Sequence, residues 1–273
     1  MWYSMQKGVR VNPGNLKPKG EIIDVVERTK DERLTRVWEV FGQSTLHSPE
    51  RVMQAQLEPE EAAIWLANRV ADFKLQGSDI ALVAGGFDVP HDCHEWYLRH
   101  CLMQATIKTL ESRGDTVDDE KIMDAMASGK VRLIVSIDSD KALDARKGSQ
   151  KNKGGIPRPV YPWASRAQRI AGYCYINPKT NEVHQLVGVV SRECTIDYQG
   201  TPLESARYTA DWLNRLGLLD TYIVYSEHPG DEQAAQSIGI DHIVIPDGIV
   251  YARDPRTDKE FSSSGIIRSI RGE

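Results

Sequence analysis

From residue 79 onward, short apolar segments alternate with segments of helical periodicity. Five runs have the length and composition of buried strands: residues 79–84, 131–137, 185–190, 222–225 and 242–245. Helical patterns lie between and around them, at about residues 91–112, 118–128, 163–172, 203–216 and 230–238. Strands that alternate with helices form βα units, and such units build parallel sheets that are covered on both faces. The sequence therefore predicts an α/β, Rossmann-like fold with a mostly parallel sheet and helices on both faces.

The first quarter of the chain has a different pattern. Residues 1–20 contain prolines and basic residues without an apolar period, which is typical of an exposed arm. Apolar residues then recur every three or four positions between residues 22 and 41, and this spacing predicts one or two amphipathic helices. A further helix is expected from about Pro59, because proline is favoured in a first helical turn. We divide the chain into a helical N-terminal extension, residues 1–76, and a second domain, residues 77–273.

Composition excludes several classes of protein. The 34 Lys and Arg residues against 39 Asp and Glu residues give a formal net charge of −5, whereas dedicated nucleic-acid-binding domains are usually basic. No apolar run approaches the ~18–20 residues of a membrane span, and the N-terminus has no apolar core of a signal peptide. The four cysteines contain no CxxC pair and form no disulfide framework. We expect a cytoplasmic protein that binds neither nucleic acid nor membrane.

Polar residues with possible chemistry follow the first strand of the predicted sheet, where α/β sheets bind ligands. Gly85 and Gly86 allow the backbone to approach a ligand closely, and Asp88 is a candidate cap for the turn or the next helix. His91 and His94 lie three residues apart at the start of that helix, so both rings can project from one face. A helix N-terminus favours anions, and two imidazoles add donors for phosphate oxygens. The simpler alternative is a capped turn with two solvent-facing histidines.

A metal site is a second alternative for this segment. The stretch contains five possible ligands: His91, Cys93, His94, His100 and Cys101. Zinc needs about four ligands with compatible directions, and on a helix Cys93 points away from the face of the two histidines. No second pair of ligands elsewhere completes a site. The sequence therefore assigns no metal ligand.

Two further clusters follow later strands. Lys147 precedes Gly148, and Arg158 and Arg166 follow after a Gly- and Lys-rich segment. Near the C-terminus, Arg256 precedes the serines at 262–264, which are expected to cap a final helix. The simpler interpretations are a solvated basic face and a plain helix cap. A cap and a phosphate site use the same exposed N–H groups, so these two interpretations of the serines are compatible. The chain contains no P-loop, GxGxxG, HExxH or GxSxG motif.

Taken in order, the three segments resemble the HIGH-motif nucleotidyltransferases of the cytidylyltransferase type. The nearest patterns are those of glycerol-3-phosphate cytidylyltransferase and the heptose-1-phosphate adenylyltransferase domain. Patterns of this family recur here in the same order, position by position or with short insertions: G-x-F-D-x-x-H-x-G-H, K-G, R-P-V-x-P-x-x-x-R and R-T-x-G-I-S-T-T-x-I-I. The matching residues are Gly85, Phe87, Asp88, His91, His94, Lys147, Gly148, Arg158, Pro159, Val160, Pro162, Arg166, Arg256, Thr257, Ser262, Ser263, Ser264, Ile266 and Ile267. The chain departs from the family at Cys93, which replaces a glycine, and in insertions at 114–130 and 149–157.

The resemblance implies transfer of CMP or AMP from CTP or ATP to a phosphorylated small molecule, such as a sugar or polyol phosphate, with release of pyrophosphate. It implies catalytic roles for His91, His94 and Lys147. It implies nucleotide binding by a second set: Gly85, Gly86, Phe87, Asp88, Arg166, Arg256, Ser262, Ser263 and Ser264. Magnesium would accompany the triphosphate.

Two matters stay open at this point. The same fold without catalysis would be a nucleotide-binding or regulatory module. The family commonly forms homodimers, and three aromatic residues of the extension, Trp38, Phe41 and Trp65, fit either a dimer contact or packing onto the chain's own core.

Overall fold

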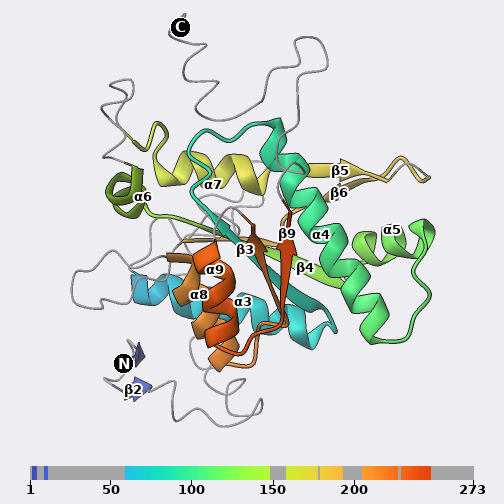
Figure 1. Cartoon of the computed structure of the whole chain (residues 1–273), viewed down its shortest axis with the longest axis horizontal. Coiled ribbons are helices and arrows are strands. Elements are labelled where there is room, and N and C mark those ends of the chain that lie inside the picture. Colours follow the sequence, from blue (N-terminus) through green and yellow to red (C-terminus); the bar gives the residue numbers. More distant parts are fainter. Residues whose placement is uncertain are drawn as a thin grey trace, which may run out of the picture.

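The computed structural model describes residues 2–4, 9–11, 59–147, 158–177, 179–192, 205–226 and 229–246. Within these ranges, five strands form one parallel sheet in the order β7-β4-β3-β8-β9 (Figure 1). Their bounds are β3 (Asp79–Gly85), β4 (Val131–Ile137), β7 (Val189–Arg192), β8 (Thr221–Tyr225) and β9 (His242–Ile245). The predicted α/β, Rossmann-like fold is confirmed.

The strand order places the topological switch point beside β3, the first strand of the parallel sheet. The chain runs from β3 outward through β4 to β7, and then returns to the other side of β3 to add β8 and β9. The crevice of an open α/β sheet lies at the carboxyl ends of the strands where the order reverses, here between β3 and β8. The segment after β3 therefore leads directly into the position where such folds bind ligands.

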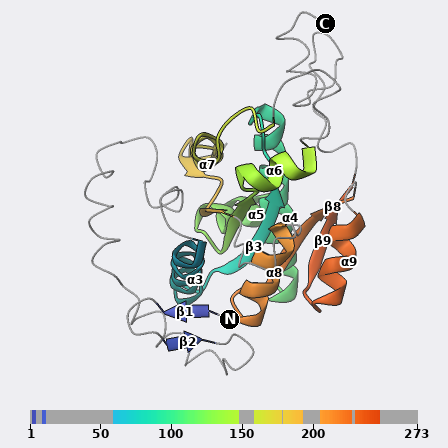
Figure 2. The same ribbon diagram turned by 90° about the vertical axis from the view of Figure 1, so that its left-hand side faces the viewer.

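Helices cover both faces of this sheet (Figures 1 and 2). Within the described residues, one apolar core joins the sheet to α4 (Asp92–Ser112), α5 (Asp119–Ala127) and α7 (Trp163–Ala171). The other joins it to α3 (Pro59–Leu75), α8 (Ser205–Arg215) and α9 (Pro229–Ser237). In β3, Ala81 and Val83 belong to the first core, and Ile80 and Leu82 to the second. Because both faces of the strand are buried, its sequence is a continuous apolar run.

Helix α3 lies within the predicted N-terminal extension but packs on the sheet. Leu66 and Val70 are fully buried, and Trp65 is 9% exposed in the same core as Leu82 of β3. Trp65 thus packs onto the chain's own core, whereas the helices expected between residues 22 and 41 lie outside the described residues, and with them Trp38 and Phe41. The domain boundary at 76/77 stays a prediction.

The third strand differs from its prediction. The run 185–190 is divided between two sheets: β6 (Val183–Gln185) pairs antiparallel with β5 (Cys174–Ile176), and β7 begins only at Val189. Between them the Gly188 amide donates to the Leu133 carbonyl at 2.9 Å, and a Cβ on Gly188 would lie 3.4 Å from that oxygen. Gly188 thus contacts β4 while Gln185 pairs with β5, and hydrophobicity alone does not reveal this change of partner strand. A second short pair, β1 (Trp2–Ser4) with β2 (Val9–Val11), lies in the segment expected to be an arm.

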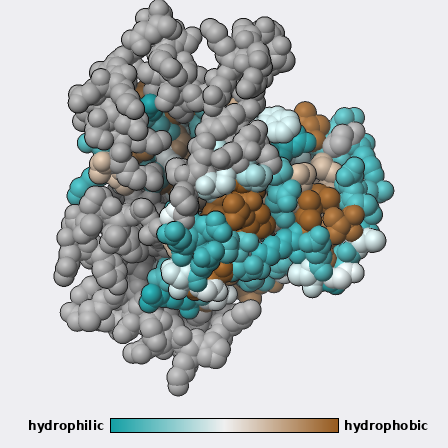
Figure 3. All heavy atoms as spheres, in the orientation of Figure 1, coloured by the Kyte–Doolittle hydropathy of each residue, from teal (hydrophilic) through white to brown (hydrophobic). Residues whose placement is uncertain are grey.

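The described surface is mostly hydrophilic in the view of Figure 3, with small separate hydrophobic areas. Within the described part of the chain, no helix combines the length and the apolar character needed to cross a membrane.

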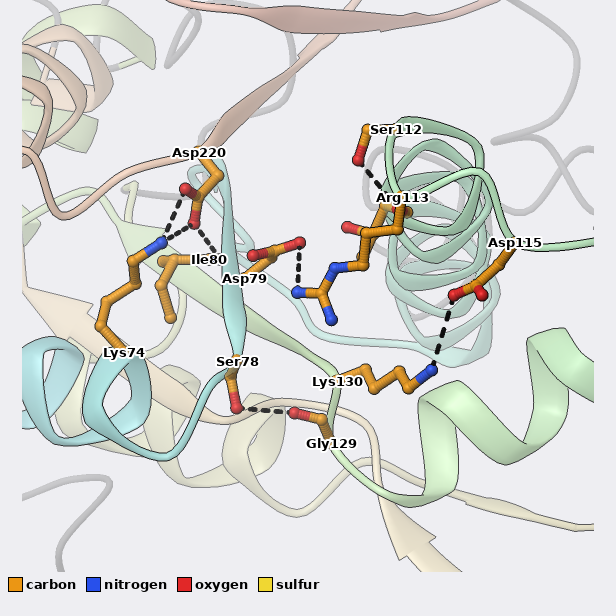
Figure 4. A network of polar contacts seen from close by, with 11 residues as sticks. Lys74, Ser78, Asp79, Ile80, Ser112, Arg113, Asp115, Gly129, Lys130 and Asp220 are labelled. Atoms are coloured by element: carbon orange, nitrogen blue, oxygen red, sulfur yellow. Dashed lines mark hydrogen bonds and ion pairs between the residues drawn. The ribbon is translucent and has the colours of Figure 1, made fainter.

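Charged groups tie the elements together at the amino ends of the strands (Figure 4). The Lys74 ammonium of α3 lies 2.6 Å from a carboxylate oxygen of Asp220, which precedes β8. The same carboxylate accepts a hydrogen bond from the Ile80 amide of β3 at 2.7 Å. On the other face, Arg113 after α4 pairs with Asp79 at 3.0 Å. These contacts fix the strand starts at the end of the sheet opposite the carboxyl ends of the strands.

We expect Asp220→Ala to lower the free energy of unfolding by about 1–2 kcal/mol, because it removes the acceptor of a backbone amide and the partner of Lys74. Denaturant unfolding followed by circular dichroism measures the change. Glu120→Ala is the control: Glu120 makes an exposed pair with Lys179, and its loss should change the stability by less than about 0.5 kcal/mol. Equal effects of the two substitutions would contradict the role of Asp220.

Candidate functional site

Arg166 joins the loops at the carboxyl ends of β3 and β4. Its side chain is fully buried, and all three guanidinium nitrogens donate to protein oxygens. The Nε group donates a hydrogen bond to the Tyr161 carbonyl at 3.1 Å, and one terminal nitrogen donates to the Gly86 carbonyl. The other terminal nitrogen donates hydrogen bonds to the Asp138 carbonyl at 2.8 Å and to the Asp140 carboxylate at 2.7 Å. Arg166 thus fixes the loops after β3 and β4 relative to each other. Its predicted contact with a nucleotide stays a prediction.

Asp88 has a similar structural partner. Its carboxylate is 1% exposed, forms an ion pair with Arg158 and accepts the Val160 amide at 2.7 Å. The first segment predicted from the sequence is therefore bound directly to the second, although 70 residues separate Asp88 from Arg158. A buried carboxylate with a guanidinium and an amide as partners fixes the loop that leads into α7. Its predicted contact with nucleotide stays a prediction.

The turn after β3 needs its first glycine. Phe87 has a φ of 43°, in the left-handed region that non-glycine residues seldom adopt. This turn brings the phenyl ring back over Gly85, where an added Cβ would lie 3.0 Å from a ring carbon. The ring also meets the His94 imidazole edge-on at a centroid distance of 5.2 Å. Gly85 and Phe87 therefore shape the turn that carries the histidines.

His91 and His94 form the capping box of α4. His91 is the N-cap, and its Nδ1 accepts the Cys93 amide at 3.3 Å. The Nδ1 of His94 accepts the His91 amide at 3.2 Å. A ring nitrogen that accepts an N–H carries no proton, so the proton of each neutral imidazole is on Nε2. The ring centroids lie 4.0 Å apart, and the cap therefore fixes two neighbouring imidazoles in the same tautomer.

The surroundings of His91 favour its neutral form. Partial burial lowers the pKa of His91 below its ordinary value of 6.5, against a smaller opposing effect of the Asp92 carboxylate. The Tyr173 hydroxyl donates to the His91 carbonyl at 3.1 Å and further fixes the turn. A neutral imidazole keeps Nδ1 as the acceptor of the cap, so ionisation and helix capping are coupled.

A pocket of about 550 Å³ opens beside His91, between the start of α4 and the exposed side of α7. Asp92 lines it from α4, and Ser165, Gln168 and Arg169 line it from α7. Arg169 donates to the Pro90 carbonyl at 3.3 Å. The pocket therefore adjoins the histidine pair.

Several predicted site residues lie beyond what the structure describes. Lys147 is the last residue of α6 (Asp140–Lys147), the short helix after β4, so its backbone is placed but its side chain is not described. Outside the described ranges lie Gly148, Arg256, Ser262, Ser263 and Ser264. The structure brings Gly85, Gly86, Phe87, Asp88 and both histidines together with Arg166 at one edge of the sheet.

Metal ligands are not grouped in the described ranges, where no three His, Cys, Asp or Glu side chains could hold one ion. The cysteines of the zinc alternative, Cys93 and Cys101, are both buried, and Cys101 belongs to the core between α4 and the sheet.

Sequence reasoning missed the residues that line the pocket from α7. The signal was present in the helical period: Trp163, Ala167 and Ile170 are buried, and this stripe directs Ser165, Gln168 and Arg169 outward. Arg166 lies on the buried side of the same helix, so the two arginines of α7 have opposite surroundings.

No family model matches the chain, and no curated protein is significantly similar to it.

We expect His91→Ala to lower the free energy of unfolding by about 1 kcal/mol, because it removes the N-cap acceptor of α4. His91→Asn supplies another good N-cap acceptor and should retain most of this stability. Denaturant unfolding of the two variants at pH 7.5 makes the comparison. If both lose the same stability, His91 does not act as the cap.

The His91 pKa shift gives a pH dependence with a defined sign. A histidine whose folded-state pKa lies below 6.5 binds fewer protons than in the unfolded chain, so its contribution is complete above the unfolded pKa and falls as the pH drops from about 6.5 toward the folded pKa. Wild type should therefore lose more stability than His91→Asn between pH 7.5 and pH 5.5. Parallel unfolding curves at both pH values test this, and an equal loss in the two proteins would contradict it.

Proposed function

We propose that the protein is a nucleotidyltransferase that transfers CMP or AMP from a nucleoside triphosphate to a phosphorylated small molecule. The observation that carries this proposal is the capped histidine pair at the start of α4. The helix has 21 residues, follows β3, the first strand of the parallel sheet, and begins at the switch point of that sheet. The positive end of a helix dipole favours anions, and two Nε2–H groups fixed in one tautomer are suitable donors for phosphate oxygens.

The proposed reaction is a direct in-line displacement. An oxygen of the acceptor phosphate forms a bond to the α-phosphorus, while the bond from that phosphorus to the bridging oxygen breaks and pyrophosphate leaves with the electron pair. A phosphate with a second pKa of about 6 is largely ionised at pH 7, so the attacking oxygen needs no general base. Catalysis then consists of alignment and charge stabilisation. In this scheme, His91 and His94 donate to the oxygens of the α-phosphoryl group.

Other residues have supporting roles in this proposal. Lys147 neutralises phosphate charge from the end of α6, and Arg256 with the serines at 262–264 binds the nucleotide. Gly85, Gly86 and Phe87 form the turn against which the triphosphate lies. Arg166 and Asp88 act as positioning residues, because their charged groups are bonded to Gly86, Asp138, Arg158 and Val160.

Magnesium fits this site as a companion of the triphosphate rather than as an ion held by protein alone. Mg²⁺ in such sites takes few protein ligands and obtains the rest from phosphates and water. Asp140 would contact the ion, because its side chain is 45% exposed at the carboxyl end of β4 even though its carboxylate forms an ion pair with Arg166. When bound, the ion supplies charge neutralisation of the phosphate oxygens.

The donor nucleotide should be revealed by a thermal-shift panel of ATP, CTP, GTP, UTP and dTTP with Mg²⁺. A ligand at a hundred times its Kd adds about 2.7 kcal/mol of apparent stability, so we expect a clear shift for CTP or ATP. Pyrophosphate release on addition of phosphorylated acceptors then separates the enzyme from a non-catalytic module. Nucleotide binding without any pyrophosphate release would support the module.

We expect His94→Gln to lower kcat by about 10²–10³, the usual loss for one transition-state donor. Glutamine at this third helical position can still accept the N-cap amide, so the capping box and the fold should persist. Turnover and thermal unfolding are measured on the same preparation. A loss of less than about threefold, which is far below the usual effect of such a donor, would remove His94 from the mechanism.

Lys147→Ala should reduce turnover more than Lys151→Ala or Lys153→Ala, because Lys147 ends the helix after β4 whereas the other two lie in the insertion. Steady-state kinetics of the three variants decide this. Equal effects would assign the phosphate contact to the insertion.

A further inference from the structure

The pocket beside His91 has a lining with no net charge. One carboxylate, Asp92, and one guanidinium, Arg169, offset each other, and the His91 imidazole is held in its neutral form as the cap acceptor. The remaining polar side chains carry hydroxyls and an amide and belong to Tyr161, Ser165, Gln168 and Tyr173, whose hydroxyl donates to the His91 carbonyl. Such groups both donate and accept hydrogen bonds, as the hydroxyls of a sugar or polyol do. A site for several phosphates would instead gather cations.

Two tyrosines line the pocket, and the ring face of one of them, Tyr161, is already occupied. The Arg169 guanidinium lies over the Tyr161 ring, with its central carbon 5.5 Å from the ring centroid. Arg169 is also fixed by its bond to the Pro90 carbonyl. A quaternary ammonium group is typically bound by a cage of several open aromatic faces, and here a protein cation covers the Tyr161 face. The pocket therefore suits an uncharged, hydroxyl-rich group better than a cationic headgroup.

The pocket also has the right position. His91 lines it and at the same time stands 4.0 Å, centroid to centroid, from His94. A molecule bound there extends toward the histidine pair from the side of α7. Figure 1 shows α7 beside the upper end of α4, where this helix begins.

From this position and chemistry we infer that the α4–α7 pocket binds the hydroxyl-bearing part of the acceptor, a sugar or polyol phosphate whose phosphate lies at the His91 end. This inference rests on the proposed function. Within it, Gln168, Ser165 and Asp92 recognise hydroxyl groups and determine the choice of acceptor. They do not contact the triphosphate.

The test uses Gln168→Leu, since Gln168 is exposed on α7 and its loss leaves the core intact. Gln76→Leu is the matched control, because Gln76 is also exposed and lies after α3 at the opposite end of the sheet. The probes are glycerol 3-phosphate, ribose 5-phosphate and glucose 1-phosphate, with phosphocholine as the cationic counterpart. Binding of each probe at millimolar concentration is measured by saturation-transfer NMR, and pyrophosphate release is measured with CTP and ATP.

We expect at least one hydroxyl-rich phosphate to bind, and Gln168→Leu to raise its Kd and KM about fivefold through loss of a side-chain hydrogen bond. The control should match wild type, and the Kd of the triphosphate should stay within about twofold in both variants, since neither change removes a nucleotide contact. A preference for phosphocholine, no binding of any hydroxyl-rich probe to wild type, or an unchanged Kd in Gln168→Leu would overturn the inference.

Failure of the proposed function has a different signature. In that case triphosphates neither bind nor yield pyrophosphate, whatever the probes do. The NMR measurement reports on the pocket without turnover, so probe binding that depends on Gln168 would still support a hydroxyl-recognising site. Loss of probe binding together with intact nucleotide binding would count against the pocket alone.

Discussion

The hydrogen bonds of the buried Arg166 guanidinium are the interactions on which the loops at the carboxyl ends of the strands depend. The guanidinium bonds the carbonyls of Gly86 after β3 and Asp138 after β4, and it also bonds the Asp140 carboxylate. A charge without solvent contact is tolerated only where protein groups satisfy its hydrogen bonds, so these loops cannot separate without leaving a buried charge unsatisfied. The turn that carries His91 begins directly from this point.

The two ends of the sheet have divided roles for a physical reason. At the amino ends, pairs such as Lys74 with Asp220 link helices to strand starts (Figure 4). At the carboxyl ends, buried hydrogen bonds hold the loops together. The N-terminus of α4, which is the positive end of its dipole, lies near the switch point. Partly exposed ion pairs therefore join the elements at one end of the sheet, and the buried Arg166 network and the histidine pair lie at the other.

The histidine pair has a structural role through one ring nitrogen, and the proposed function assigns a chemical role to the other. Each Nδ1 accepts a backbone amide of the capping box, and this bond decides where the remaining proton lies. Because burial lowers the pKa of His91, the neutral imidazole keeps Nδ1 as the cap acceptor and its proton on Nε2, the donor of the proposed function. Substitutions that retain the cap acceptor, asparagine at 91 and glutamine at 94, therefore separate folding from chemistry.

The sequence by itself determined the sheet, because strands buried on both faces are continuous apolar runs and only the divided run at 185–190 misled the prediction. It also identified the segment 85–94, because two glycines and two histidines directly after a first strand already define a turn and a helix start. Spacing along the chain could not decide which charged groups face a ligand. That depends on the rotation of α7, which buries Arg166 against Gly86 and Asp138 and turns Arg169 and Gln168 toward the pocket. Only tertiary packing selects between these arginines, because burial is decided by the elements that a helix contacts and not by residue type.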